Sequence, residues 1–211
     1  GVEFNPGGNT PGYLNLFTGF SIKPMAGDTR RWWEFVRNVI CSGNEEVYRY
    51  VRRWLAHIFQ QPGELPGTAL VMRGLQGTGK NTFARVIGKL VAPHYIELHS
   101  MDQVTGRFNG HMKMSLVNHA NEAIWGGSKQ QVGALKGMIT DPEIAIEQKG
   151  VDIYTIKNYR RLIVSSNEEW AVPADADDRR FVFLNVSATR ANDTAYFAAL
   201  HAELDAGGYA A

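Results

Sequence analysis

The stretch best suited to chemistry is GLQGTGKNTF, which runs from Gly74 to Phe83. An apolar run with strand character, 69–72, precedes it, and a stretch with helical character, 81–90, follows it. Glycines let a turn curl until its backbone N–H groups converge, and the start of a helix adds its positive dipole end. This layout predicts a loop that cradles phosphate groups.

The spacing of this loop fits the pattern G-x-x-x-x-G-K, with Gly74, Gly79 and Lys80 at the fixed positions. We expect Lys80 to reach the outer phosphates as a point charge. Asn81 stands where a serine or threonine would hold Mg²⁺, so either Thr82 makes the metal contact or Asn81 supplies an amide oxygen. The alternative is a glycine-rich turn that binds nothing. The residues expected at the nucleotide are Gly74, Gln76, Gly77, Thr78, Gly79, Lys80, Asn81 and Thr82.

Polar residues follow two further apolar strands. The segment MSLVNHANEA ends in Asn121 and Glu122, and RRLIVSSNEE ends its apolar part before Asn167. A nucleoside triphosphatase needs a carboxylate to activate water and to organise Mg²⁺. Glu122 is the acid at its strand end, so we expect it to be the catalytic base. An amide at the position of Asn167 could orient the attacking water, although both residues also suit an ordinary loop or turn.

Two adjacent arginines, Arg179 and Arg180, stand before the last predicted strand in DADDRRF. An arginine there can act as a finger that stabilises charge on the transferring phosphoryl group, and it can do so across a subunit boundary. The alternative is ion pairing with the neighbouring acids Asp175, Asp177 and Asp178.

The elements that must position these residues alternate between strand and helix, which predicts an α/β fold with a central, mainly parallel sheet. Two helices, 28–42 and 44–61, are expected before the core, with Asp28 and Asn44 as their caps. A last helix is expected from a cap at Asn192 to Gly207. The strands are expected near 68–73, 95–98, 113–119, 161–166 and 180–186, with a helix at 128–140 and a β-hairpin formed by 144–146 and 151–156.

The chain has 211 residues, enough for one large domain or a domain with a small extension. We expect an extended and helical lead at 1–60, a core at 61–190 and a C-terminal helix at 191–211. Residues 1–27 are rich in Gly and Pro, and the side chains expected to pack this lead onto the domain are Tyr13, Leu14, Leu16 and Phe17. The start at Gly1 and the Ala/Gly-rich end indicate an excised fragment.

Composition limits the partners. The net charge of +1 argues for no particular partner, so a nucleic-acid surface would be a local patch. Cys41 is the single cysteine, which excludes an internal disulfide and fits a reducing compartment. The scattered histidines argue against a zinc site. No stretch approaches the roughly 20 apolar residues of a membrane span, and there is no signal peptide. We expect a cytoplasmic protein without membrane contact.

Taken together, several segments resemble the superfamily 3 helicases, most closely the phage and poxvirus-type primase-helicases. The resembling segments are GLQGTGKNT, LVNHANEA, IEQKGVDIYTIKNYRRLIVSSNE and VPADADDRRF, with GRFN and LKGMIT also similar to phage members. The resemblance covers roughly residues 60–190. It implies a P-loop NTPase core of the AAA+ type, assembly as hexameric rings, and ATP hydrolysis that drives translocation on single-stranded DNA.

The resemblance also implies roles for individual residues. Lys80 would contact the phosphates, Glu122 would be the acid of the second motif, Asn167 the polar sensor and Arg180 the finger acting in trans. Lys149 sits where the family places a lysine that faces the channel. An exposed hairpin lysine can also grip a DNA phosphate on physical grounds, although it can equally be a solvated surface charge. The departures Asn81 and Asn121 leave the Mg²⁺ ligands open among Thr82, Asn81 and Asn121.

The sequence therefore predicts an ATP- and Mg²⁺-dependent DNA helicase domain of a phage or mobile-element replication protein, located in the host cytoplasm if phage-encoded. Primase or polymerase motifs would lie outside this segment. One alternative is a non-motor ATPase that serves as an assembly switch or loader. A second is a P-loop phosphotransferase, a class that usually needs an arginine-rich lid, whereas the one basic pair found here is 179–180.

Overall fold

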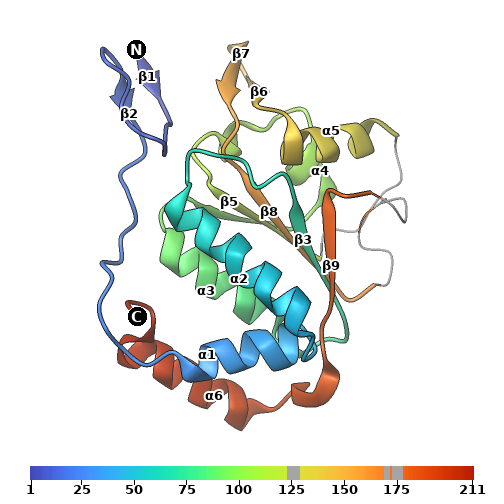
Figure 1. Ribbon diagram of the computed structural model, residues 1–211. Coiled ribbons are helices and arrows are strands. Elements are labelled where there is room, and N and C mark those ends of the chain that lie inside the picture. The colour runs from blue at the N-terminus through green and yellow to red at the C-terminus, as the bar shows by residue number, and fades with distance from the viewer. Residues whose placement is uncertain (123–128, 169–171, 173–177) are drawn as a thin grey trace.

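A five-stranded sheet forms the centre of the molecule, and all its neighbouring strands run parallel (Figure 1). The computed structural model describes residues 1–122, 129–168, 172 and 178–211. The strand order is β4-β5-β8-β3-β9. The carboxyl ends of parallel strands meet at one edge, so the residues that follow β3, β5 and β8 come together. The strands are β3 (Ala69–Arg73), β4 (Tyr95–Leu98), β5 (Val117–Asn121), β8 (Arg161–Ser166) and β9 (Phe181–Asn185).

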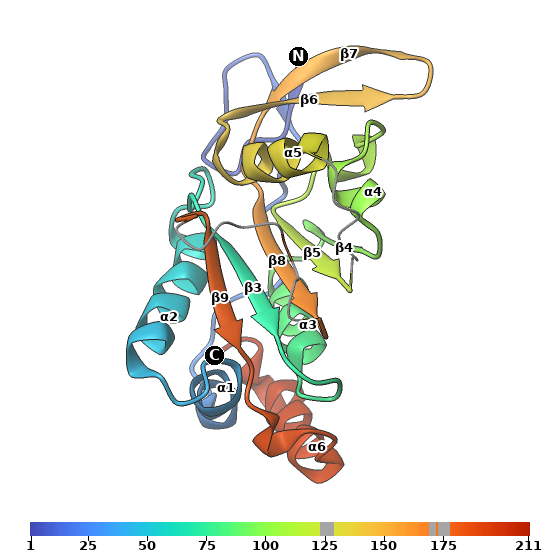
Figure 2. The same cartoon turned by 90° about the vertical axis from the view of Figure 1, so that its right-hand side faces the viewer.

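Both faces of the sheet are covered, which confirms the expected α/β architecture. Helices α2 (Glu45–Gln60) and α3 (Lys80–Val91) cover one face, and α4 (Met101–Thr105) and α5 (Lys129–Thr140) lie on the other side (Figure 2). Leu70 and Met72 of β3 belong to the first core cluster, whereas Val71 belongs to the second. This alternation follows from the two-residue period of a strand, and it explains why β3 is apolar throughout.

The lead packs differently from expectation. Its two short strands, β1 (Val2–Glu3) and β2 (Leu14–Asn15), pair in parallel. Tyr13 and Leu14 remain 51% and 65% exposed, so the prediction that they pack on the domain was wrong. The pairing of β1 with β2 leaves Leu14 facing solvent. Phe17 does pack on the domain as predicted, with its ring centroid 4.9 Å from that of His94, and Phe4, which was not predicted, lies 5.1 Å from the same ring.

Several element boundaries also shift. Helix α1 (Arg30–Phe35) begins two residues after Asp28 and continues as a π-helical turn, η1 (Val36–Ile40). A 3-10 turn, η2 (Gly110–Met112), delays the start of β5 to Val117. Asp193, not Asn192, caps α6 (Thr194–Glu203), because Asn192 has a left-handed φ of 59° and its backbone turns away from the helix. The expected cap Ser128 lies outside the described residues, and the remaining short turns are η3 (Ala188–Arg190) and η4 (Leu204–Gly208).

The predicted hairpin is confirmed as a separate antiparallel pair, β6 (Glu143–Gln148) and β7 (Val151–Lys157). Gly150 adopts φ 76° in its turn, a conformation that favours glycine. The hairpin leads into the start of β8 and therefore lies beyond the amino edge of the sheet, opposite the β3–α3 loop (Figure 2).

Candidate functional site

The loop between β3 and α3 lies at the carboxyl edge of the sheet. Gly77 and Gly79 have φ values of 76° and 93°, in the left-handed region that favours glycine. Thr78 is fully buried, and its Oγ1 donates to the carbonyl of Leu75 at 2.8 Å, which holds the loop closed. A pocket of about 240 Å³ opens above this loop, lined by Gln76, Gly77, Thr78, Gly79, Lys80, Asn81, Thr82, Glu122, Asn167 and Phe197.

Lys80 lies at the bottom of this pocket and is only 6% exposed. Its Nζ donates to the carbonyls of Gly74 and Leu75 at 2.7 and 2.8 Å, and to Asn167 Oδ1 at 2.9 Å. Burial lowers the pKa of Lys80, and the carboxylate of Glu122 acts in the opposite direction. The three acceptors satisfy the ammonium group, but all three are neutral oxygens, and a phosphate oxygen could replace the two backbone carbonyls.

Asn167 links the lysine to the acid. Its Nδ2 donates to Glu122 Oε1 at 2.7 Å, while its Oδ1 accepts from Lys80. Strand β8 lies between β3 and β5, which places Asn167 between the two other strand ends. Glu122 adopts φ 51°, an uncommon conformation for a residue with a Cβ, and its backbone N–H donates to the carbonyl of Ser165 at 2.8 Å. The structure thus brings together Lys80, Glu122 and Asn167.

A buried set of polar groups lies behind the pocket. Ser165 Oγ is 3.2 Å from Asn81 Oδ1 and 3.4 Å from Asn121 Oδ1, within donating distance of both. Asn121 Nδ2 donates to Glu97 Oε1 at 2.6 Å. The single proton of the Ser165 hydroxyl can go to only one of the Asn81 and Asn121 amide oxygens at a time. Thr82 lines the pocket and makes no side-chain hydrogen bond within the described part of the chain.

Sequence reasoning missed Glu97 and Ser165. Glu97 forms an ion pair with Arg85 at 3.2 Å, and hydrogen bonds from Arg85 and Asn121 hold its pKa below the usual value despite its partial burial. An acid inside the short apolar strand YIEL was the available signal. Ser165 carried no such signal, because its contacts come from helix α3 and strand β5, both far from it in the sequence.

The C-terminal segment also reaches the loop, which sequence reasoning did not predict. The backbone N–H of Asn192 donates to the carbonyl of Gly77 at 3.0 Å. A Cβ at Gly79 would lie 2.8 Å from the ring of Phe197 and 2.9 Å from the ring of Phe35. Glycine is therefore required at this loop position by packing as well as by backbone conformation.

Arg179 and Arg180 lie far from the loop of their own chain. The carbonyl of Arg180 accepts from the N–H of Ala69 at the start of β3, which places both arginines at the amino edge of the sheet. Arg180 forms an ion pair with Asp178 at 3.3 Å, and Asp178 also pairs with Lys136 at 2.8 Å. Arg179 is exposed. The other two acids considered for pairing, Asp175 and Asp177, lie outside the described residues.

Lys149 is exposed in the turn of the hairpin, as its predicted role requires. It also lies at the amino edge of the sheet. Strand β8 begins after the hairpin and ends just before Asn167, so it directly connects the hairpin at the amino edge of the sheet to Asn167 at the carboxyl edge.

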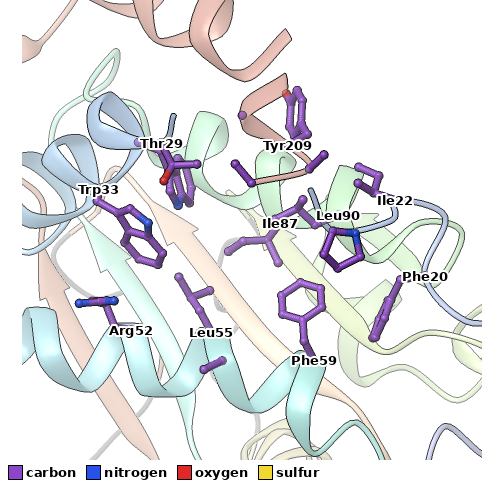
Figure 3. Close-up of a pocket in the computed structure, with 16 residues that line it drawn as sticks. Phe20, Ile22, Thr29, Trp33, Arg52, Leu55, Phe59, Ile87, Leu90 and Tyr209 are labelled. Atoms are coloured by element: carbon purple, nitrogen blue, oxygen red, sulfur yellow. The ribbon is translucent and has the colours of Figure 1, made fainter. Parts of the chain in front are cut away.

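A larger cavity, of about 490 Å³, lies away from the loop (Figure 3). It is enclosed by the lead, α1, α2, the second half of α3 and the C-terminal residues. Its walls are apolar and include Trp33, Leu55, Phe59 and Leu90, with the Arg52 guanidinium 4.9 Å from the Trp33 ring. The cavity offers little of the polar chemistry that a triphosphate needs.

Within the described ranges, no cluster of three or more His, Cys, Asp or Glu side chains is arranged to hold a metal ion. A metal at the loop would therefore depend on one or two side chains together with ligand oxygens. Among the helices that the structure describes, none has the length and apolar character to cross a membrane.

This chain is similar to a protein of one phage. The "DNA Primase-polymerase" of Nitratiruptor phage NrS-1 is 32% identical over 182 residues, covering 80% of this chain and 24% of that protein. An apo structure of the NrS-1 C-terminal region matches with a TM-score of 0.79 and 26% identity, covering 99% of this chain and 54% of that chain. A second form, at 24% identity and a TM-score of 0.79, shows the shared fold. The chain spans about half the length of these solved relatives.

The family match takes in most of the site. It covers residues 72–180, which include the glycine loop, Glu122, the hairpin, Asn167 and both arginines. Because this match extends over more than half of the chain, the protein belongs to DUF5906, a family of unknown function.

Proposed function

We propose that this chain is the ATP-dependent DNA helicase domain of a phage or mobile-element replication protein, with a P-loop NTPase core. The observation that carries the proposal is the hydrogen-bonded series Lys80–Asn167–Glu122 at the mouth of a glycine loop that starts a helix. A cation, a polar amide and a carboxylate at these places are the groups that phosphoryl transfer to water requires. The similarity to a phage primase-polymerase supports the replication role.

Nucleotide binding would exchange the partners of Lys80. Its Nζ now uses the carbonyls of Gly74 and Leu75, and β- and γ-phosphate oxygens would take their place as charged acceptors. The exchange is favourable because a buried ammonium group gains more from an anionic oxygen than from a neutral one. The N–H groups of Gly77 to Lys80 at the start of α3 would contact the same phosphates.

The residues present fit a hydrated Mg²⁺ ion held partly by the nucleotide. Mg²⁺ usually keeps several waters and takes one or two protein oxygens beside substrate phosphates. Thr82 is the favoured protein ligand, because it lines the pocket with its hydroxyl unpaired among the described residues, whereas Asn81 and Asn121 point their oxygens toward Ser165 behind the pocket. The bound ion would supply charge neutralisation on the phosphate oxygens.

Glu122 would act as the general base. Its carboxylate is exposed in the pocket and is held by Asn167 through one oxygen, Oε1, which leaves Oε2 to accept a proton from the attacking water. Asn167 spans Lys80 and Glu122, so the same amide would position the water relative to the γ-phosphate.

The proposed motor needs DNA and neighbouring subunits. Lys149 in the exposed hairpin turn would hold a phosphate of single-stranded DNA, and β8 connects this hairpin to Asn167. Arg180 would reach the nucleotide site of the neighbouring subunit in a ring. A hexamer, and a primase or polymerase domain in the same polypeptide, belong to this proposal.

The first test removes the two charged groups of the site. Lys80→Ala removes the phosphate contact and Glu122→Gln removes the base, so each should lower the ATP hydrolysis rate by at least about a hundredfold. Lys89→Ala, on the exposed face of the same helix, is the control and should hydrolyse ATP at the wild-type rate. Full activity in Lys80→Ala would contradict the proposed site.

The second test separates the motor from hydrolysis. Lys149→Ala should retain most of the ATP hydrolysis and lose strand separation, because the hairpin lies at the other end of the sheet from the pocket. Lys157→Ala, at the base of the hairpin, is the matched control. Measuring hydrolysis with and without single-stranded DNA distinguishes the motor from a loader: a rate that DNA leaves unchanged, with no unwinding, would favour the loader.

A further inference from the structure

Two adjacent arginines at the start of β8 have different surroundings. Arg160 and Arg161 are 4% and 1% exposed. Both terminal nitrogens of Arg161 are occupied, and the backbone carbonyls that accept from them belong to Tyr159, Gln61, Pro62 and Glu64. Arg160 directs Nε and Nη2 at a single carbonyl, that of Met112, at 3.1 and 2.7 Å. Its Nη1 has no hydrogen-bond partner within the described ranges.

The charge of Arg160 is therefore poorly compensated. Among the ion pairs between described residues, none includes Arg160. Burial lowers the pKa of Arg160 to about 10, still well above neutral pH, so the side chain stays charged. Nη1 is not among the fully buried, unpartnered atoms of the described residues, so water or a ligand can reach it, and an anionic oxygen there would form a charge-assisted hydrogen bond.

Arg160 lines a pocket of about 300 Å³ between α4, α5 and the start of β6. In Figure 2, α5 lies directly below β6, with α4 beside it. Gly133 forms part of the wall and its missing Cβ would meet no protein atom within 4 Å, so a ligand can approach the backbone closely there. The volume is sufficient for a phosphate group with part of a nucleotide.

We propose that this pocket binds a phosphate group through the guanidinium of Arg160. The free Nη1 is a directional donor of the kind that suits a phosphate oxygen. Asp141 and Glu143 also line the pocket, but both are exposed at its rim, where water and salt screen them, whereas Arg160 is buried.

The pocket lies against the hairpin, so a bound ligand would be next to β6. Ile144 and Ala145 of β6 form one wall. Asn109, also in the wall, donates to the carbonyl of Ala145 at 2.8 Å and accepts from the N–H of Glu147 at 3.0 Å, which anchors β6 to the preceding loop. The phosphate group would belong either to a free nucleotide or to a nucleic-acid strand at the hairpin. These two candidate sources rest on the proposed function, whereas the anion site itself does not.

The experiment is done in the Lys80→Ala background, so that binding at the glycine loop does not contribute. Inorganic phosphate is titrated while the melting temperature is followed, and the melting temperature should rise and saturate. Gly133→Leu should abolish the rise, because a Cβ at Gly133 meets no protein atom within 4 Å and the added side chain enters the pocket. Thr140→Leu, on the exposed end of the same helix, should retain the rise.

Arg160→Gln should also abolish the rise, and Gly133→Leu keeps the test valid if Arg160→Gln fails to fold. Thymidine monophosphate and an oligothymidylate are then titrated in the same variants. A Gly133-dependent response to the mononucleotide alone assigns a free nucleotide, and a stronger response to the oligomer assigns a strand. A rise that is equal in Gly133→Leu and its parent, or no rise with any of the three probes, would overturn the proposal whatever the fate of ATP hydrolysis.

Discussion

At the scale of single residues, the buried side chain of His119 makes the stability of the protein depend on pH. Its Nδ1 lies 2.9 Å from the hydroxyl of Tyr95, and its Nε2 contacts Ser165 Oγ, whose neighbours are Asn81 and Asn121. Burial lowers the pKa of His119 to about 4, so the ring is neutral at physiological pH. A neutral ring can donate on one side and accept on the other, as this arrangement requires.

Acid should therefore destabilise the protein. In the unfolded chain His119 takes up its proton near pH 6.5, whereas in the folded chain it does so only near pH 4. The stabilisation is present above pH 6.5 and is lost as the pH falls from 6.5 to 4, by on the order of 3 kcal/mol. Urea unfolding at several pH values measures this slope.

The control variants separate His119 from the other histidines. His119→Gln should flatten the slope in this window, whereas His201→Gln, at an exposed position, should leave it unchanged. Part of the slope should remain in His119→Gln, because burial also lowers the pKa values of His57 and His94. Identical slopes in wild type and His119→Gln would contradict this explanation.

At the scale of elements, helix α1 depends on the last residue of α6. The first backbone N–H groups of a helix need outside acceptors. Those of Arg31 and Trp32 donate to the two carboxylate oxygens of Glu203, each at 3.1 Å. A negative group at this end also interacts favourably with the helix dipole. The C-terminal helix thus fixes the helix that supplies Phe35 to the glycine loop.

Glu203→Ala should lower the free energy of unfolding by about 1–2 kcal/mol, because two N–H groups lose their acceptors. Glu203→Gln should cost less, since one amide oxygen remains. Asp205→Ala is the control: it removes only a surface ion pair with Lys89 and should cost less than about 1 kcal/mol. Chemical denaturation provides the comparison, and equal losses in Glu203→Ala and Asp205→Ala would argue against the cap.

At the scale of the whole molecule, the proposed working parts lie at opposite ends of the sheet. The glycine loop, Asn167 and Glu122 are at the carboxyl edge, whereas Arg180 and the hairpin are at the amino edge. Arg180 cannot complete the pocket of its own chain. In a head-to-tail ring, the interface would be heterologous, so one subunit's amino edge could face the next subunit's pocket.

Mixing two inactive variants tests this arrangement. Lys80→Ala and Arg180→Ala should each abolish ATP hydrolysis alone, and an equal mixture should recover about a quarter of the sites, those that join an intact loop to an intact arginine. Arg179→Ala serves as the control for the adjacent position. A mixture that co-assembles, as judged by light scattering, and yet stays inactive would exclude Arg180 as a residue acting in trans.

Local patterns were sufficient to predict much of this protein. The glycine loop, the helix after it, the hairpin and the polar strand ends follow from residue types whose backbone preferences act over a few positions. The parallel sheet follows from the alternation of elements, and it required Lys80, Asn121 and Asn167 to share an edge. The two boundaries between the three expected segments, at 60 and 190, remain predictions. Residues of all three segments contribute to one core cluster.

Other features arose from contacts between residues far apart in the chain, which no local spacing encodes. Insertion of β8 between β3 and β5 placed Asn167 between Lys80 and Glu122. Asn192 does not cap α6 as expected; its backbone N–H instead donates to the carbonyl of Gly77 in the glycine loop. The hydrogen bond of Asn121 to Glu97, that of α1 to Glu203, and the unpaired nitrogen of Arg160 also depend on the tertiary structure. In each case the elements meet because the folded chain buries their apolar side chains together.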